Sequence, residues 1–368
     1  MSEIKIDTLS SVHIGNGNFL QQGNDFLVES NYINVLSLDK LGRIIGTDNN
    51  SMQQWLDAIE KGDAELFVKK KIQGHDYQEY SIRRIENHAE FNQWQSTLKE
   101  YIHDGMGRPY IPGSSIKGAI RTVVMSSLAR KKIIQRLNKE RDRKKWKKII
   151  QEMENELLHF EAYTRNGKRD TGPSSDIFRF LSTGDAFFDN GVEIAVKQIN
   201  LNITEKESLL DKKKPQVVEA IKSGVSSQFR LLIGDEFYHY SGIYDISDLF
   251  KMINDHTYNL LCDEIDFWAK GDGSQYTGQD DYLDQLDIIL DTIEECQPNE
   301  CILRIGQASG WRFVTGAWLE DIDKQYFKNV IVPLCRPKND RYRGYPFPKS
   351  RRIDESSNVF GFVKLTAI

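Results

Sequence analysis

Residues 109–121 carry the pattern that decides the fold: Pro109-Tyr110-Ile111-Pro112-Gly113-Ser114-Ser115-Ile116-Lys117-Gly118-Ala119-Ile120-Arg121. Pro112 favours an extended conformation for the residue before it and ends any earlier helix. Ser114 or Ser115 is expected to cap the helix that follows. Backbone N–H groups at such a terminus attract anions, and Lys117 and Arg121 lie one turn apart on one face. The stretch therefore predicts a phosphate-binding corner, and RNA presents a chain of phosphates.

A nucleotide-binding P-loop does not fit this corner. That motif needs Gly-x-x-x-x-Gly-Lys-Ser/Thr, with the lysine directly after the second glycine. Here Lys117 precedes Gly118, and no Ser or Thr follows at the magnesium position. Nucleotide hydrolysis is therefore disfavoured. An ordinary capped helix with both cations on its solvated face remains an alternative.

Length and composition describe a soluble globular protein. The chain has 368 residues, which suggests about two domains. Hydrophobic residues make up 39% and charged residues 28%, and the net charge is −5. Because the chain is not a bulk polycation, any nucleic-acid binding must come from a local basic surface. A protein with no nucleic-acid partner is also compatible with this charge.

Two segments have opposite charge. Residues 130–148 contain eleven Lys or Arg and two acids, whereas residues 263–295 contain eleven Asp or Glu and one Lys. Solvated surfaces are the expectation, although pairing with each other or with neighbours stays open. Five aspartates in the acidic segment have helical spacing: Asp280, Asp281, Asp284, Asp287 and Asp291. Carboxylates placed in this way could bind a cation, but no EF-hand loop surrounds them. We therefore expect a solvated acidic face and no metal.

The four cysteines give no sign of a zinc site. They are Cys262, Cys296, Cys301 and Cys335, and none forms a C-x-x-C pair. So few cysteines, with no signal peptide and no run of about 18 apolar residues, predict a cytoplasmic protein without a membrane partner.

Hydrophobic periodicity predicts an α+β protein with antiparallel sheets. Ile116, Ile120, Val123, Val124 and Leu128 fall on one face of a helix. Residues 244–268 and 282–293 are also expected to be mainly helical. Strands at 177–188 and 192–199 are expected to form a hairpin that turns at Asp189-Asn190-Gly191.

The pattern Pro-Gly-Ser-Ser-x-Lys-Gly-x-x-Arg resembles the signature of the RAMP superfamily, the RNA-binding subunits of CRISPR effector complexes. Four further blocks, in the family's order, resemble the type III-A (Csm complex) subunit that caps the filament at the crRNA 3′ side. They are residues 12–17 with 25–28, residues 178–186, residues 303–311, and residues 345–352 with 361–365. The loop at 303–311 is sparse in glycine, with only Gly306 and Gly310.

The resemblance implies a fold and a role. It implies a ferredoxin-like, RRM-type β-α-β-β-α-β core, expected twice, with helical insertions. The expected domains are 1–200, with an insertion around 125–160, and 201–368, with an insertion around 244–295. The implied function is a non-catalytic, cofactor-free assembly subunit that supports crRNA maturation and antiviral defence. Its implied partners are crRNA, a neighbouring RAMP backbone subunit, the small helical subunit of the complex and host nucleases.

The expected RNA contacts follow from these blocks. They are Gly113, Ser114, Ser115, Lys117, Arg121, His13, Gly306, Ser309, Gly310, Trp311, Arg312 and Arg351. Aromatic residues beside cations, as in Trp311-Arg312, suit stacking against bases. A buried tryptophan is the alternative for that pair.

An endoribonuclease acting on crRNA or target RNA is the alternative function. A metal-independent ribonuclease needs a general base near the 2′-OH. His13, beside a Gly-Asn-Gly turn, is the best candidate, followed by His103. Asp185 sits in a strand block and is expected to be structural. An enzyme of small-molecule metabolism lacks any cofactor motif here.

Overall fold

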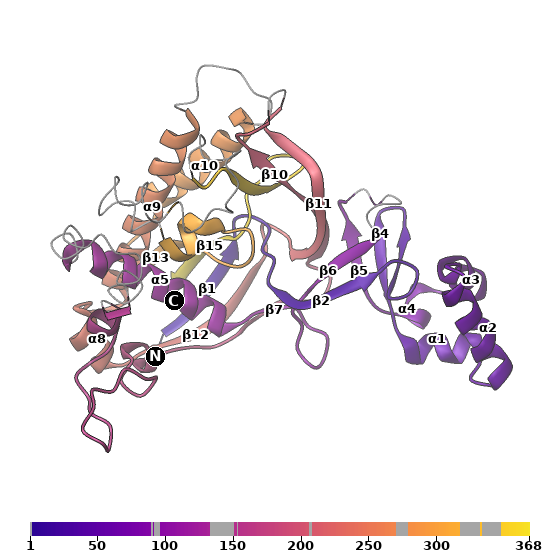
Figure 1. Ribbon diagram of the computed structural model, residues 1–368, viewed down its shortest axis with the longest axis horizontal. Helices are drawn as coiled ribbons and strands as arrows, with labels where there is room; N and C mark the ends of the chain where they lie inside the picture. The colour runs from indigo at the N-terminus through magenta and orange to yellow at the C-terminus, as the bar shows by residue number, and fades with distance from the viewer. Residues whose placement is uncertain are drawn as a thin grey trace.

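The computed structural model describes residues 2–89, 91, 96–132, 151–152, 154–205, 208–269, 279–316, 332 and 347–368. The described elements form a main body and a smaller lobe that projects from it (Figure 1).

The main body is built on a five-stranded sheet with the order β13-β15-β1-β12-β8. All neighbouring strands in it run antiparallel. The strands are β13 (Glu300–Arg304), β15 (Phe362–Ala367), β1 (Ser2–Thr8), β12 (Ser226–Ile233) and β8 (Leu181–Thr183). The first strand of the chain therefore lies in the middle of the sheet, directly beside the last.

The order of elements around this sheet is ferredoxin-like. Helix α5 (Gly113–Lys132) lies between β1 and β8 in the chain, and α9 (Ile246–Ala269) lies between β12 and β15. The series β1-α5-β8-β12-α9-β15 is a β-α-β-β-α-β unit. Helix α10 (Gln279–Glu294) and β13 are added before the last strand. The expected α+β class with a ferredoxin-like core is confirmed.

The apolar face of α5 faces the core as its spacing predicts. Ile116, Ile120 and Val124 are fully buried and share a core cluster with Ile4 and Ile6 of β1. A period of 3.6 residues places these positions on one side of the helix. The predicted stripe is therefore confirmed, and the polar positions of α5 are left for the outer face.

A second sheet of eight strands connects the main body to the lobe. Its order is β2-β6-β11-β10-β5-β4-β3, and β14 also pairs with β10. The strands are β2 (Gly15–Gln21), β6 (Thr97–Tyr101), β11 (Leu210–Ile221), β10 (Glu193–Asn202), β5 (Ser81–Asn87), β4 (Tyr32–Leu36), β3 (Phe26–Glu29) and β14 (Ser350–Asp354). Both sheets combine strands from before and after residue 200.

The hairpin predicted at residues 189–191 is wrong. The short strand β9 (Ala186–Phe187) pairs with β7 (Tyr110–Ile111) and not with β10. Strand β10 pairs instead with β11, β14 and β5. The turn residues permit a hairpin locally, but distant strands supply the better partners.

The lobe packs short helices on β3 and β4. They are α1 (Leu38–Ile45), α2 (Asn49–Glu60), α3 (Ala64–Lys71) and α4 (Tyr77–Tyr80). Asp48 caps α2, and Asp76 with Glu79 forms a capping box on α4. Leu41 and Val68 of these helices are buried against Leu27 and Leu36 of the strands.

The helices expected at 244–268 and 282–293 correspond to α9 and α10. Most of the basic segment 130–148 and of the insertion expected around 125–160 lies outside the described residues. No helix in the described ranges is both long and apolar enough to cross a bilayer.

Candidate nucleic-acid interface

Helix α5 begins at Gly113, and a carboxylate already occupies its N-terminus. The Gly113 N–H donates to Asp185 Oδ1 at 2.7 Å, and Thr183 Oγ1 donates to the Gly113 carbonyl at 2.6 Å. The N–H groups of Ser115 and Ile116 both donate to the carbonyl of Pro112. The predicted cap by Ser114 or Ser115 is therefore replaced by Asp185, which has the structural role expected of it.

Gly113 is required by close packing. An added Cβ would lie 2.3 Å from the Thr183 carbonyl oxygen and 2.7 Å from that of Gly184. Neither backbone atom can move away as a flexible side chain would. The glycine of the motif thus lets α5 start directly against the end of β8.

The two cations of the motif have different surroundings. Arg121 donates to Asp176 Oδ2 at 2.6 Å and to Glu154 Oε1 at 3.2 Å. It also lies over the Phe178 ring, 5.2 Å from the centroid. Lys117 is partly exposed, and no described residue forms an ion pair with it. Lys117 is therefore the freer of the two to meet an incoming anion.

The glycine-rich loop after β13 is fixed against the linker between β1 and β2. Gly306 has φ +78°, and a Cβ there would lie 2.6 Å from the His13 carbonyl oxygen. The Gln307 N–H donates to that same carbonyl at 2.8 Å. Ser309 is buried, and its hydroxyl donates to the carbonyls of Ile305 and Gly306. The loop is therefore held in place by these contacts, and of the predicted contacts in it only Gly310 is well exposed.

His13 lies in the core. Its side chain is 0% exposed, and its Nδ1–H donates to the Glu219 carbonyl. Burial lowers the pKa of His13 despite that hydrogen bond, so the ring is neutral at pH 7. A buried ring offers RNA no atom, which corrects the expectation that His13 contacts RNA or acts as a general base.

Arg312 and Arg351 are also internal. Both surround Glu264 of α9, which is 1% exposed. Arg351 donates to both carboxylate oxygens, and Arg312 Nε lies 3.5 Å from Oε2. Burial would raise the pKa of Glu264, but Arg351 and Arg312 lower it to about 2. The two arginines thus stabilise a buried carboxylate, which corrects their expected role on the surface.

The motif helix and the glycine-rich loop are neighbours. Thr122 Oγ1 of α5 donates to the carbonyl of Val314 at 3.2 Å, in the segment Arg312–Gly316 that follows the loop. Trp311, between them, is partly buried and meets the Phe347 ring edge-on at 5.1 Å. The described surface that joins the two motifs therefore exposes Ser114, Lys117, Gly118, Gln307 and Gly310 in whole or in part.

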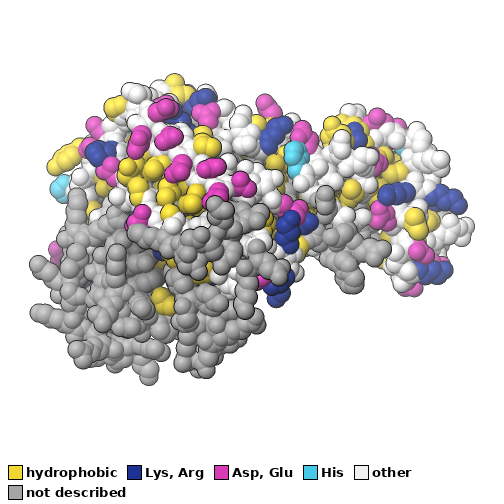
Figure 2. Space-filling model, turned by 90° about the horizontal axis from the view of Figure 1, so that it is seen from above, with side chains coloured by type: hydrophobic (Ala, Val, Ile, Leu, Met, Phe, Trp, Pro, Cys, Tyr) yellow, Lys and Arg dark blue, Asp and Glu magenta, His cyan; other side chains and the backbone are white. Residues whose placement is uncertain are grey.

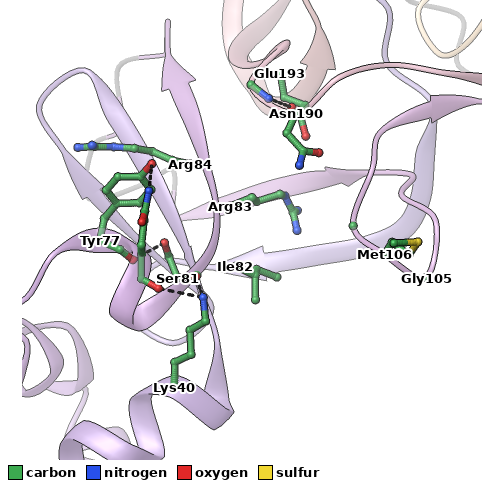
Figure 3. Close-up of a pocket in the computed structure, with 13 residues that line it drawn as sticks. Lys40, Tyr77, Ser81, Ile82, Arg83, Arg84, Gly105, Met106, Asn190 and Glu193 are labelled. Carbon is green, nitrogen blue, oxygen red and sulfur yellow. Dashed lines mark hydrogen bonds between the residues drawn. The ribbon is translucent and has the colours of Figure 1, made fainter.

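A pocket of about 950 Å³ lies where the lobe meets the main body (Figure 3). Sequence reasoning missed it because its walls come from α1, β5, the loop at 105–107 and the turn at 190–191. Arg83 extends from β5 into the space between Ile82 and Asn190 in this view. It donates to Glu219 Oε1 at 2.8 Å and to Glu100 Oε1 at 2.9 Å.

His103 belongs to the same charged network. Its Nδ1–H donates to the Tyr101 carbonyl, and its Nε2 lies 3.1 Å from Glu193 Oε1. His103, Glu193 and Glu219 form the one group of described residues whose ligand atoms are close enough to share a metal ion. Because both oxygens of Glu219 already accept hydrogen bonds, from Arg83 and from the Tyr101 N–H, the network holds itself together without an ion.

The acidic aspartates form a solvated face, as expected. Asp280, Asp281, Asp284, Asp287 and Asp291 of α10 are all exposed. Acidic side chains lie among apolar ones on the upper surface of the main body, whereas several Lys and Arg side chains lie on the far end of the lobe (Figure 2).

The model of the RAMP superfamily matches residues 5–313. That match spans most of the chain and includes both motifs. The chain belongs to the RAMP superfamily. The resemblance inferred from the Gly-Ser-Ser-x-Lys-Gly block is confirmed.

Solved structures share this RAMP fold over the whole chain. One is a chain of a cryo-EM structure of a Csm-crRNA-target RNA ternary complex of a type III-A CRISPR-Cas system. It has a TM-score of 0.72 and 20% identity, and all of both chains is covered. Another is the crystal structure of T. onnurineus Csm5, with a TM-score of 0.64 and 20% identity over 98% of this chain and 99% of that one.

A curated relative matches a short part of the RAMP sequence. It is the CRISPR system protein Csm5 of Streptococcus thermophilus, which is 57% identical over 30 residues. The match spans 8% of each chain.

Proposed function

We propose that this RAMP protein is the subunit of a type III-A Csm complex that caps the filament at the crRNA 3′ side. The observation that carries the proposal is its likeness, over the full length of both chains, to a chain of a Csm-crRNA-target RNA complex. The full-length likeness to T. onnurineus Csm5 and the short match to Csm5 of Streptococcus thermophilus support the same subunit.

The interface supplies a mechanism for binding. Lys117 stands on the outer side of α5, and the loop segment that follows Gly310 lies against the same helix. A ribose-phosphate strand crossing this junction would contact Lys117 and exposed backbone of the protein. These groups recognise the shape and charge of the RNA backbone and do not distinguish one base from another. Base pairing by the guide would then read the target.

A binding role without catalysis fits the surroundings of each candidate catalyst. His13 is buried, His103 is tied to Tyr101 and Glu193, and Asp185 caps α5. Each side chain therefore has a structural task. In this role the protein would contact crRNA, a neighbouring RAMP subunit and the small helical subunit, and it would support crRNA maturation by host nucleases.

The test is to purify the tagged chain with its co-expressed Csm partners and to sequence the bound RNA. We expect crRNA whose ends cluster at one 3′ boundary. Lys117→Gln should weaken crRNA retention in rising salt, whereas Lys61→Gln, an exposed lysine after α2, should not. Recovery of the complex without crRNA would refute the proposal. Cleavage of labelled repeat RNA by the chain alone, with or without magnesium, would favour the endoribonuclease instead.

A further inference from the structure

One face of the second sheet carries two cations, Lys99 and Arg352, that form no ion pair within 4.0 Å with any described carboxylate. Cross-strand partners share a face, so Phe19 of β2, Lys99 of β6 and Val218 of β11 point the same way. Val218 pairs with Val196 of β10, and Gln198 follows two residues later on the same face. Gln198 pairs with Asp354 of β14, which places Arg352 on this face too. We call these side chains the polar face.

The glycine-rich loop lies on the polar face. Ala308 of the loop packs against Ile194, Val196 and Phe360. The linker that holds the loop also adjoins β6, the strand of Lys99, because the Ile102 N–H donates to the Ile14 carbonyl at 2.9 Å. The loop and the polar face are therefore neighbours.

Lys99 and Arg352 are close to each other. Burial lowers the pKa of Lys99, and the charge of Arg352 lowers it further. Burial also lowers the pKa of Arg352, against the attraction of Asp211. No ion pair joins either cation to an acid within 4.0 Å among the described residues. Two like charges held together on one face favour an anion between them.

Arg352 and the neighbouring Gln198 have buried polar atoms without hydrogen-bond partners. Arg352 Nη1 is buried and unpaired, and so are both the nitrogen and the oxygen of the Gln198 side-chain amide. Buried donors are rarely left unpaired in folded proteins. An acceptor-rich group at this place would accept from the two nitrogen donors, Gln198 Nε2 and Arg352 Nη1, and neutralise the pair of cations.

We propose that the polar face binds the backbone of single-stranded RNA, with one phosphate between Lys99 and Arg352. This rests on the proposed function and extends the path of the RNA beyond the two family motifs. A phosphodiester brings the negative charge and the acceptor oxygens that these donors lack. Phe19 stands beside Lys99, 55% exposed and 5.6 Å from its Nζ at the ring centroid, where a base can stack. A protein carboxylate bound between the two cations would bring no base to stack on the Phe19 ring.

The experiment measures binding of a labelled 20-nucleotide poly(U) RNA to the purified full-length chain over a series of salt concentrations. The variant is Lys99→Gln/Arg352→Gln. The control is Lys61→Gln/Lys70→Gln, which removes the same charge from exposed positions of the lobe. The double variant should bind about tenfold or more weakly, and its log–log salt slope should fall by about one, while the control matches the wild type. Thermal unfolding of each variant shows that it folds.

The outcomes separate this site from the proposed function. If the wild type retains crRNA in the complex and Lys117→Gln weakens that retention, but the double variant keeps the wild-type affinity and salt slope, the polar face is not an RNA site. If the double variant instead loses a co-purified subunit while its RNA slope is unchanged, the face docks protein and the inference is overturned. If a folded Phe19→Leu variant binds RNA with the wild-type affinity, the proposed stacking contact is refuted and the phosphate contact is not.

Discussion

Replacing Glu264 with Gln removes one negative charge from the middle of a cluster and changes almost no volume. In the wild type, Trp268 Nε1 and Tyr282 OH donate to Glu264 Oε1 at 2.8 and 2.9 Å. An amide oxygen can keep those two hydrogen bonds. It cannot balance the charges of Arg351 and Arg312, which are both largely buried beside it. The substitution therefore removes the negative charge and the hydrogen bond from Arg351 Nη2 to Oε2, while the hydrogen bonds to Oε1 can remain.

The structure sets the size of the effect. A pKa of about 2, against an ordinary value of 4.5, corresponds to about 3 kcal/mol of stability. Because the pKa of the folded state is the lower one, this stability is fully present above pH 4.5 and is lost as the pH falls toward 2. Removal of one partner from a buried ion pair costs about 3–5 kcal/mol, which agrees in scale.

Urea unfolding at pH 7, followed by circular dichroism, measures the change. We expect Glu264→Gln to lose about 3 kcal/mol and Asp287→Asn, an exposed carboxylate of α10, to stay within about 0.5 kcal/mol of the wild type. Repeating the measurement at decreasing pH below 4.5 should narrow the gap between wild type and Glu264→Gln. A loss of less than about 1 kcal/mol at pH 7, or a gap independent of pH, would show that Glu264 does not balance these arginines.

Five further substitutions test the two motifs by the same unfolding measurement. Gly113→Ala, whose Cβ would lie 2.3 Å from the Thr183 carbonyl oxygen, should cost about 2 kcal/mol or more, whereas Gly118→Ala, with open space around it, should stabilise α5 by up to about 1 kcal/mol. Gly306→Ala should lower the stability more than Gly310→Ala. Both glycines have positive φ, but only at Gly306 would the new Cβ meet a backbone atom, the His13 carbonyl oxygen, at 2.6 Å. Equal losses of stability would contradict this. Arg121→Gln should cost only about 1 kcal/mol, because its ion pairs are partly exposed; a loss above about 3 kcal/mol would mean they are shielded from water.

Local patterns predicted the helices of this protein well. The stripe from Ile116 to Leu128 needs only a period of 3.6 residues, and the structure buries it as expected. The Gly-Ser-Ser-x-Lys-Gly block also identified the superfamily correctly, and its first glycine, Gly113, is constrained by close packing against the end of β8.

The pairing of strands that are distant in the chain could not be predicted from the sequence. The hairpin expected at residues 189–191 does not form, because β10 pairs with three strands from elsewhere in the chain, β11, β14 and β5. The same limit applied to the site. Arg312 and Arg351 look like surface cations until Glu264 is seen between them, and nothing local in the sequence reveals that meeting.

The position of β1 has a consequence for synthesis of the protein on the ribosome. This strand emerges before both of its neighbours, which are residues 226–233 and 362–367. Until the last of these leaves the exit tunnel, one side of β1 has bare amide and carbonyl groups that can pair with other chains. We therefore expect nascent chains to depend on chaperones until residue 367 has emerged, and the central sheet to close only afterwards.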